Sequence, residues 1–120
     1  MKQNFRLTED ARQDLFEIAR YIANDNLMAA GRFLEFFEHA CDMLSDLPEM
    51  GSILEALSRS SMKETRMFPV KHFTNYLIFY RSLAGKKIEV IRIVHGARDL
   101  PALFGTSGIE NENGEEQKAA

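Results

Sequence analysis

The strongest constraint on the fold is a change in the spacing of apolar residues near the middle of the chain. From Thr8 to Leu47 apolar side chains recur every three or four residues, the period of an amphipathic helix. From Glu64 to His95 apolar, β-branched and aromatic residues form short runs of strand length. Helices followed by strands in this order predict an α+β fold, with the helices packed on one face of a sheet.

The first half predicts two helices joined by a short polar turn. Thr8 can cap the first helix, because its hydroxyl can accept a hydrogen bond from a free backbone N–H in the first turn. The run Asn24-Asp25-Asn26 is expected to end that helix, since these side chains compete for backbone hydrogen bonds. A second helix is expected from about Leu27 to Leu47, where Pro48 stops it. The two form a helical hairpin.

Four segments read as strands, and the expected architecture is β-α-α-β-β-β, a helical hairpin packed on a small, mostly antiparallel sheet. Ser82–Lys86 is the expected hairpin loop between the last two strands. Pro48–Met62 is expected to be a loop, and Asp99–Phe104 a helical turn that packs back on the domain. The expected strands are Asn4–Leu7, Glu64–Phe68 ending before Pro69, Tyr76–Arg81, and Lys87–His95.

Composition favours a single intracellular domain. A chain of 120 residues with 45% hydrophobic residues suits one modest core, which we expect to span residues 1–105. Residues 106–120 hold almost nothing apolar and are expected to be a disordered acidic tail. Cys41 is the only cysteine, which excludes an intrachain disulfide, and its helical apolar neighbours predict a buried thiol. No apolar run reaches membrane-spanning length, so we expect no membrane partner and a cytoplasmic location.

The net charge of −3 conceals a strong asymmetry. Residues 58–98 carry 9 basic and 2 acidic residues, a net of +7, whereas residues 1–57 carry a net of −6 and residues 99–120 a net of −4. A basic middle segment of this size indicates contact with something acidic. The candidates are a nucleic acid, an acidic protein segment, or the acidic helices of this chain itself.

The sequence holds no strong enzyme signature. It has no phosphate-binding Gly-rich loop and no Cys/His spacing typical of a metal site, so we expect no metal and no cofactor. Strand alternation places Arg92 with Val90 and Val94, and His95 with Ile91 and Ile93. The candidate binding residues are Arg59, Arg66, Lys71, Arg81, Arg92, His95 and Arg98.

Two kinds of chemistry suit this set of cations. A metal-free ribonuclease could use Arg81 and Arg92 to neutralise a phosphate and His95 to move protons. The same cations could equally bind an acidic segment of another protein. The residues by themselves leave both readings open.

Several segments in fixed order resemble the ParE branch of the RelE/ParE superfamily, the toxins of type II toxin–antitoxin modules. The resemblance covers roughly Leu7 to Phe104, and Glu89–Pro101 (EVIRIVHGARDLP) is its most specific part. The other segments that carry it are Leu7–Ile18 (LTEDARQDLFEI), Tyr21–Ala23, Ala29–Phe33 (AAGRF), Met67–Val70 (MFPV) and Tyr76–Arg81 (YLIFYR).

The resemblance implies a growth-inhibiting toxin that a cognate ParD-like antitoxin holds silent. The two proteins are expected to form a hetero-oligomer, most simply a heterotetramer. The antitoxin is expected to bind operator DNA with its N-terminal part, so that the toxin meets that DNA only indirectly, and to wrap the toxin with its C-terminal segment. ParE-like members are associated with poisoning of DNA gyrase, and the β-α-α-β-β-β architecture is also the fold of the family.

Two alternatives accompany the gyrase reading, in which the protein is a binding toxin and not an enzyme. RelE-like members cut messenger RNA on the ribosome, often with a tyrosine near the end of the last strand. Here Gly96 follows His95 and no tyrosine occurs after Tyr80, which weakens that reading. The other alternative is an inactive toxin that acts only as an antitoxin-bound co-repressor. Near the C-terminus, Leu100, Leu103 and Phe104 either contact the target or cap the core.

Overall fold

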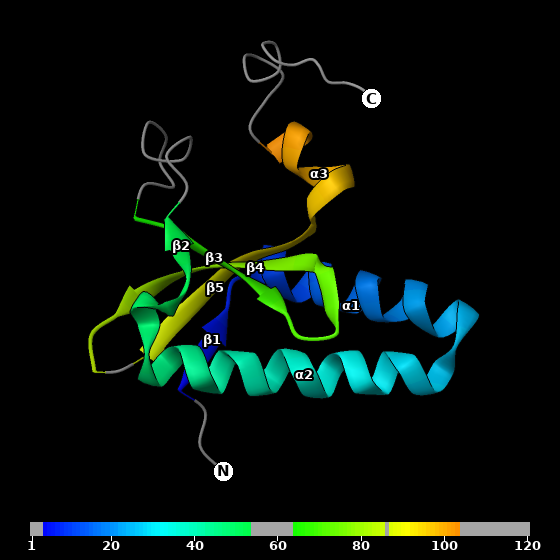
Figure 1. The fold of residues 1–120 in the computed structure, drawn as a ribbon, viewed down its shortest axis with the longest axis horizontal. Coiled ribbons are helices and arrows are strands. Elements are labelled where there is room, and N and C mark those ends of the chain that lie inside the picture. Colours follow the sequence, from blue (N-terminus) through cyan, green and yellow to red (C-terminus); the bar gives the residue numbers. More distant parts are fainter. Residues whose placement is uncertain (1–3, 54–63, 86, 104–120) are drawn as a thin grey trace.

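The computed structural model of the chain describes residues 4–53, 64–85 and 87–103 (Figure 1). Its α+β architecture and helical hairpin confirm the expected fold class. The elements are β1 (Phe5–Leu7), α1 (Glu9–Asp25), α2 (Leu27–Asp46), the 3-10 turn η1 (Pro48–Met50), β2 (Ser52–Ile53), β3 (Arg66–Val70), β4 (Phe73–Leu83), β5 (Lys87–His95) and α3 (Gly96–Leu103).

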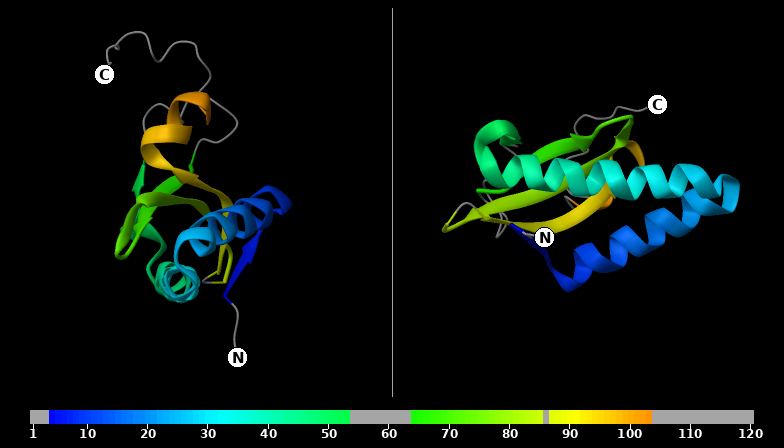
Figure 2. Two further views of the ribbon diagram at one scale, coloured as in Figure 1. Left: turned by 90° about the vertical axis from the view of Figure 1, so that its right-hand side faces the viewer. Right: turned by 90° about the horizontal axis from the view of Figure 1, so that it is seen from below.

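The five strands form one sheet in the order β1-β5-β4-β3-β2. β1 runs parallel to β5, and every other neighbouring pair is antiparallel. α1 and α2 cover one face of this sheet, and α3 lies on the other side (Figure 2). The sheet therefore has a helix-covered face and a second face, here called the open face, which carries Met67, Leu77, Phe79, Arg81, Glu89, Arg92 and Val94.

The main core lies between α2 and the sheet. Phe33 is fully buried and packs edge-on against Phe73 and Tyr76, with ring centroids 5.3 and 5.5 Å apart. Cys41 is also fully buried, as the sequence predicts, and burial raises the pKa of its thiol far above the usual range. The apolar stripe of the second helix is thus core, and Cys41 contributes to it as a small hydrophobic residue.

A β-bulge in β5 overturns one prediction about side-chain direction. Arg92 pairs with Phe79 and Val90 pairs with Tyr80, so Ile91 has no partner on β4. The extra residue reverses the alternation of faces. Val90 consequently lies in the core beneath the helices, while Arg92 lies on the open face. The expectation that Arg92 shares a face with Val90 is wrong.

Several predicted boundaries are also wrong. β4 spans Phe73–Leu83, longer than the expected Tyr76–Arg81, and it includes the first two residues of the expected hairpin loop Ser82–Lys86. β3 does not end before Pro69 but continues to Val70, and Pro69 pairs with Leu77 on β4. The two-residue β2 pairs only with the start of β3, so Pro69 lies where β3 is an edge strand and its missing N–H costs no ladder hydrogen bond. The first part of the expected loop, Pro48–Ile53, contains η1 and β2, whereas residues 54–62 lie outside the described ranges.

Tyr80 explains why the segment after α2 is ordered. Its ring is fully buried, and its hydroxyl donates to the Pro48 carbonyl at 2.6 Å and accepts the Gly51 N–H at 2.9 Å. Arg66 donates from its guanidinium to the carbonyls of Glu49 and Gly51 at 3.3 and 2.8 Å. A buried tyrosine and one arginine therefore hold this turn through its backbone.

α3 begins directly after β5 and is longer than the single turn expected at Asp99–Phe104. Leu100 packs on the open face against Phe79 and Val94, which supports the core reading for this residue. The side chain of Leu103 is not described, and Phe104, Arg59 and the predicted tail lie outside the described ranges. Among the described residues, no helix has the length and apolar character needed to cross a membrane.

Candidate functional site at the end of strand β5

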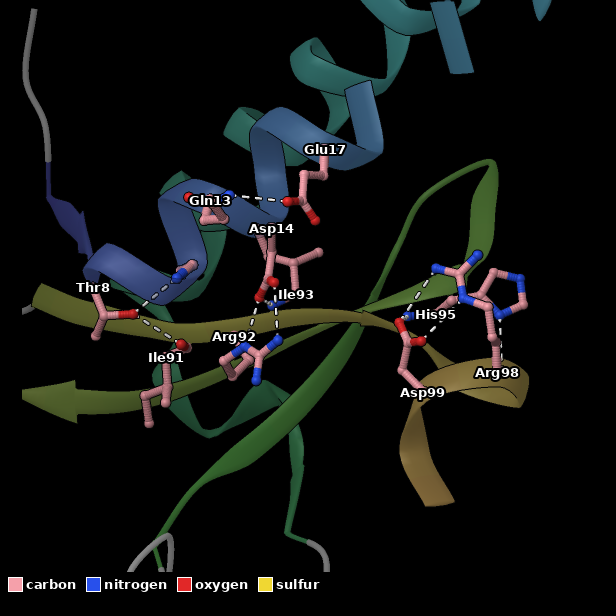
Figure 3. A network of polar contacts seen from close by, with 11 residues as sticks. Thr8, Gln13, Asp14, Glu17, Ile91, Arg92, Ile93, His95, Arg98 and Asp99 are labelled. Carbon is pink, nitrogen blue, oxygen red and sulfur yellow. Dashed lines mark hydrogen bonds and ion pairs between the residues drawn. The ribbon is translucent and has the colours of Figure 1, made fainter. Parts of the chain in front are cut away.

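The carboxylate of Asp14 links α1 to β5. It accepts two hydrogen bonds from the Arg92 guanidinium, at 2.7 and 2.9 Å, and a third from the Ile93 backbone N–H at 3.0 Å (Figure 3). The hydrogen bond to Asp14 raises the pKa of Arg92. Arg92 is therefore held against α1, partly buried, by a paired carboxylate, and the basic segment partly neutralises the chain's own acidic helix.

Thr8 completes the contact between α1 and the same strand. β1 pairs with β5 only at residues 88–90, so the following backbone groups on that edge need other partners. The Thr8 hydroxyl donates to the Ile91 carbonyl at 2.9 Å and accepts the Ala11 N–H at 3.0 Å (Figure 3). The predicted helix cap at Thr8 is confirmed, and the same side chain also covers the strand edge.

Three residues at the β5–α3 junction fix the start of α3. The Asp99 carboxylate accepts the His95 backbone N–H at 2.9 Å, and Nδ1 of His95 accepts the Arg98 N–H at 3.2 Å (Figure 3). The Arg98 guanidinium also donates to Asp99 at 3.0 Å. This reciprocal arrangement resembles a capping box, with His95 at the cap position. His95 and Arg98, both predicted binding residues, thus lie together, but their hydrogen bonds are to each other and to Asp99 and serve to start α3.

We expect α3 to loosen at low pH. The hydrogen bond from Arg98 lowers the pKa of Asp99 below its ordinary 3.8. The stabilisation is therefore complete above about pH 5, where both the folded and unfolded carboxyl are ionised, and is lost as the pH falls through the lower folded value. Hydrogen exchange of the Arg98–Leu100 amides between pH 6 and pH 2.5 should show protection that declines before that of β4.

A matched pair of variants tests this assignment. Asp99→Asn removes the charge but keeps an oxygen that can accept a hydrogen bond, so protection of α3 should be lower and no longer fall at acid pH. Asp42→Asn, at an exposed position of α2, should leave the α3 profile unchanged. Wild-type protection of α3 that stays constant down to pH 2.5 would contradict the role given to Asp99.

A pocket of about 230 Å³ lies beside this junction, between α1 and the ends of β4, β5 and α3. Tyr76, Ile18 and Ile93 are its buried residues, and Tyr76 packs edge-on against His95 with ring centroids 5.2 Å apart. Burial raises the pKa of Tyr76, and the nearby Arg98 opposes that shift. The remaining lining residues are Tyr21, Asp14, Glu17, Arg98 and Asp99, so the pocket is aromatic and acidic.

At the other end of the sheet, two arginines converge on one glutamate. Arg6 on β1, Glu89 on β5 and Arg81 on β4 are register partners in a single row across three strands. Glu89 accepts from Arg6 at 3.3 Å and forms an ion pair with Arg81 at 2.8 Å. The two arginine side chains remain 67% and 53% exposed, so this row presents excess positive charge to solvent.

The predicted cations therefore do not form one patch. Arg81 pairs with Glu89, six residues before His95, which at about 3.3 Å per residue puts the two about 20 Å apart. Lys71 is exposed at the β3–β4 turn, about 26 Å from Arg81 along β4 by the same spacing. Arg66 serves the turn after α2. Among the predicted cations that the structure describes, only His95 and Arg98, with Arg92 nearby on β5, are brought together.

Reasoning from the sequence missed Asp14, Glu17 and Tyr76. Tyr76 supplies a tyrosine next to His95 from the neighbouring strand, although no tyrosine follows Tyr80 in the sequence. Pairing the two predicted strands in register would have shown this neighbour. Within the described ranges, no group of three or more His, Cys, Asp or Glu side chains is placed to hold a metal ion.

Comparison with known protein families identifies the family of this chain. A family model, described as the ParE toxin of type II toxin-antitoxin system, parDE, matches residues 5–100. The chain belongs to the ParE toxin family. The match includes α1, the whole sheet and the first half of α3, so both the His95 junction and the Arg6–Arg81 row lie within the ParE domain.

A solved structure supports the fold of this ParE-family domain. The chain is similar to one from the "Chromosomal ParDE TA system from P. aeruginosa", with a TM-score of 0.59 and 17% sequence identity. The alignment covers 78% of this chain and 95% of that one. Among curated proteins, no sequence matches significantly. The fold and family are thus shown by independent comparisons.

Proposed function

We propose that this chain is a cytoplasmic toxin that inhibits DNA gyrase by binding, without cutting nucleic acid itself, and that a ParD-like antitoxin neutralises it. The observation that carries the proposal is the ParE family match over residues 5–100 on a matching fold. The internal pairing of the predicted catalytic cations supports a binding toxin. Arg92 is held by Asp14, and Arg81 pairs with Glu89 about 20 Å from His95 along the strand, so Arg81, Arg92 and His95 do not converge on one phosphate.

The Arg6–Glu89–Arg81 row is where we place the antitoxin's acidic segment. Two largely exposed arginines share one carboxylate there, and exposed Lys87 lies at the start of the same strand β5. An added carboxylate would find unused guanidinium N–H donors without first breaking a buried ion pair. The toxin and antitoxin would assemble as a heterotetramer, and operator DNA would be contacted through the antitoxin alone.

Induced expression without the antitoxin should arrest growth within a few generations, with filamentation and a DNA-damage response. The purified chain should inhibit supercoiling by gyrase and trap double-strand breaks, because the proposed action is on the enzyme–DNA intermediate. Gel-based supercoiling and cleavage assays measure both effects. Growth that continues normally, or arrest without any effect on purified gyrase, would count against the proposal.

A variant that removes two positive charges from the Arg6–Glu89–Arg81 row tests the proposed antitoxin contact. Arg6→Ala/Arg81→Ala should arrest growth like the wild type but require about tenfold more antitoxin for rescue, the expected loss from two exposed ion pairs. Arg12→Ala/Arg32→Ala removes the same charge from exposed helix positions and should be rescued normally. Equal rescue of both double variants would place the antitoxin elsewhere on the toxin.

A ribosome-dependent ribonuclease is the second candidate, and one observation favours it. Tyr76, which lines the pocket, packs edge-on against His95, and histidine and tyrosine are both side chains that can transfer protons. The three pocket carboxylates and the distance of Arg81 oppose the binding of a phosphate. Cleavage of ribosome-bound messages that is lost in His95→Ala, with gyrase unaffected, would select this function.

A further inference from the structure

The pocket between α1 and the β5–α3 junction is mainly acidic, whereas the surrounding sequence segment is basic. Three carboxylates line it, from Asp14, Glu17 and Asp99, together with the rings of Tyr21 and Tyr76 and a single cation, the Arg98 guanidinium. Two of the carboxylates are already paired within the molecule, Asp14 with Arg92 and Asp99 with Arg98. The third, Glu17, contacts only a neutral donor among the described residues, the side-chain amide of Gln13 at 2.9 Å (Figure 3).

The walls of the pocket suit a flat cationic group. Tyr21 is 65% exposed and stands at the rim, while Tyr76 is 8% exposed and forms part of the floor with Ile18 and Ile93. Tyrosine ring faces attract a guanidinium or ammonium group, more strongly where water is partly excluded. An exposed glutamate beside two tyrosine rings therefore combines charge and ring contacts for one positive side chain.

Other ligand classes fit this pocket poorly. An anion would meet one carboxylate without a cationic partner and two more nearby, which disfavours phosphate despite the presence of Arg98. A metal ion would need several ligands close together, and the described residues offer no such group. A volume of about 230 Å³ is below the roughly 300 Å³ at which small-molecule sites begin, so a cofactor would not be enclosed.

We propose that this pocket binds an arginine side chain of a protein partner, with Glu17 pairing the guanidinium and Tyr21 and Tyr76 contacting its faces. Arginine fits better than lysine because its planar, weakly hydrated group can stack on a ring and pair with a carboxylate at once. The Asp14–Arg92 and Asp99–Arg98 pairs set the walls and remain intact. The proposal concerns a second, acidic contact point and stands independently of the gyrase assignment.

The test uses arginine itself as the probe. The full chain, labelled with ¹⁵N, is titrated with N-acetyl-arginine amide and, separately, with the uncharged isostere N-acetyl-citrulline amide. Arginine should cause saturable shifts of the Glu17, Tyr21, Tyr76 and Ile93 amides in the millimolar range, as expected for one exposed ion pair with ring contacts. Citrulline should leave these amides unshifted, because it lacks the positive charge.

Two glutamate variants decide whether the pocket carries the effect. Glu17→Gln should weaken arginine binding at least fivefold, whereas Glu35→Gln, at another exposed glutamate, on α2, should leave it unchanged. Both positions are solvent-exposed, so both variants should fold. Equal shifts with citrulline, shifts spread over all acidic residues without saturation, or unchanged binding in Glu17→Gln would each overturn the proposal.

Discussion

Asp14→Ala should destabilise the domain by about 2–3 kcal/mol, the expected loss for charge-assisted hydrogen bonds in a half-buried site. The substitution removes the only described ion-pair partner of Arg92 and leaves the Ile93 N–H without its acceptor. The Asp14 side chain is 13% exposed and that of Arg92 is 34% exposed, so solvent recovers only part of the loss. Thermal unfolding followed by circular dichroism should show a melting point lower by about 8–12 °C.

A double-mutant cycle with Arg92→Ala separates the ion pair from the strand contact. Asp14→Ala/Arg92→Ala should cost less than the sum of the single variants by about 1 kcal/mol or more, because each single variant leaves a charge without a partner. The unpaired Ile93 N–H should keep the double variant below the wild type. Strict additivity of the two substitutions would show that the pair contributes nothing to stability.

Gly51→Ala should cost about 2–4 kcal/mol, although it adds one methyl group. A Cβ at this position would meet the hydroxyl of Tyr80, a ring carbon of the same residue at 2.8 Å, and the Met67 carbonyl oxygen at 2.9 Å. Tyr80 is fully buried and cannot move aside without losing its hydrogen bonds to Pro48 and Gly51. Urea unfolding should give a lower midpoint with a similar slope.

A second glycine provides the matched control with the opposite sign. Gly31 lies within α2, and a Cβ there would meet nothing within 4 Å. Gly31→Ala should therefore stabilise the domain by about 1 kcal/mol, the usual difference in helix propensity. A Gly51→Ala midpoint equal to or above that of the wild type would show that the close approach of Tyr80 to Gly51 does not limit that position.

Residues that act through nearby neighbours in the sequence were predictable. The amphipathic period located both helices, and the Thr8 cap follows from a contact only three residues away. The last strand, Lys87–His95, was predicted with its observed bounds because five of its nine residues are β-branched. The burial of Cys41 likewise follows from its place on the apolar face of its helix.

Predictions failed where a contact joined distant segments. A proline normally marks the end of a strand. Here β2 is too short to pair with β3 as far as Pro69, so this residue lies at a sheet edge, where a missing N–H is tolerated. The bulge at Ile91 could not be read from alternation, because it depends on how β5 pairs with β4. Tyr76 was overlooked in the sequence-based argument against a ribonuclease for the same reason. Tyr76 and His95 lie on neighbouring strands and become adjacent only when β4 pairs with β5.

The sequence by itself determined the fold class, the helical hairpin, the buried Cys41 and the resemblance to ParE toxins, because each rests on local periodicity or on contiguous motifs. It also determined that the middle segment is basic. Only the tertiary structure decided which carboxylates those cations pair with. Asp14 and Arg92 are 78 residues apart and Arg6 and Glu89 are 83 apart, so their pairing depends on strand register and helix packing that no local pattern encodes.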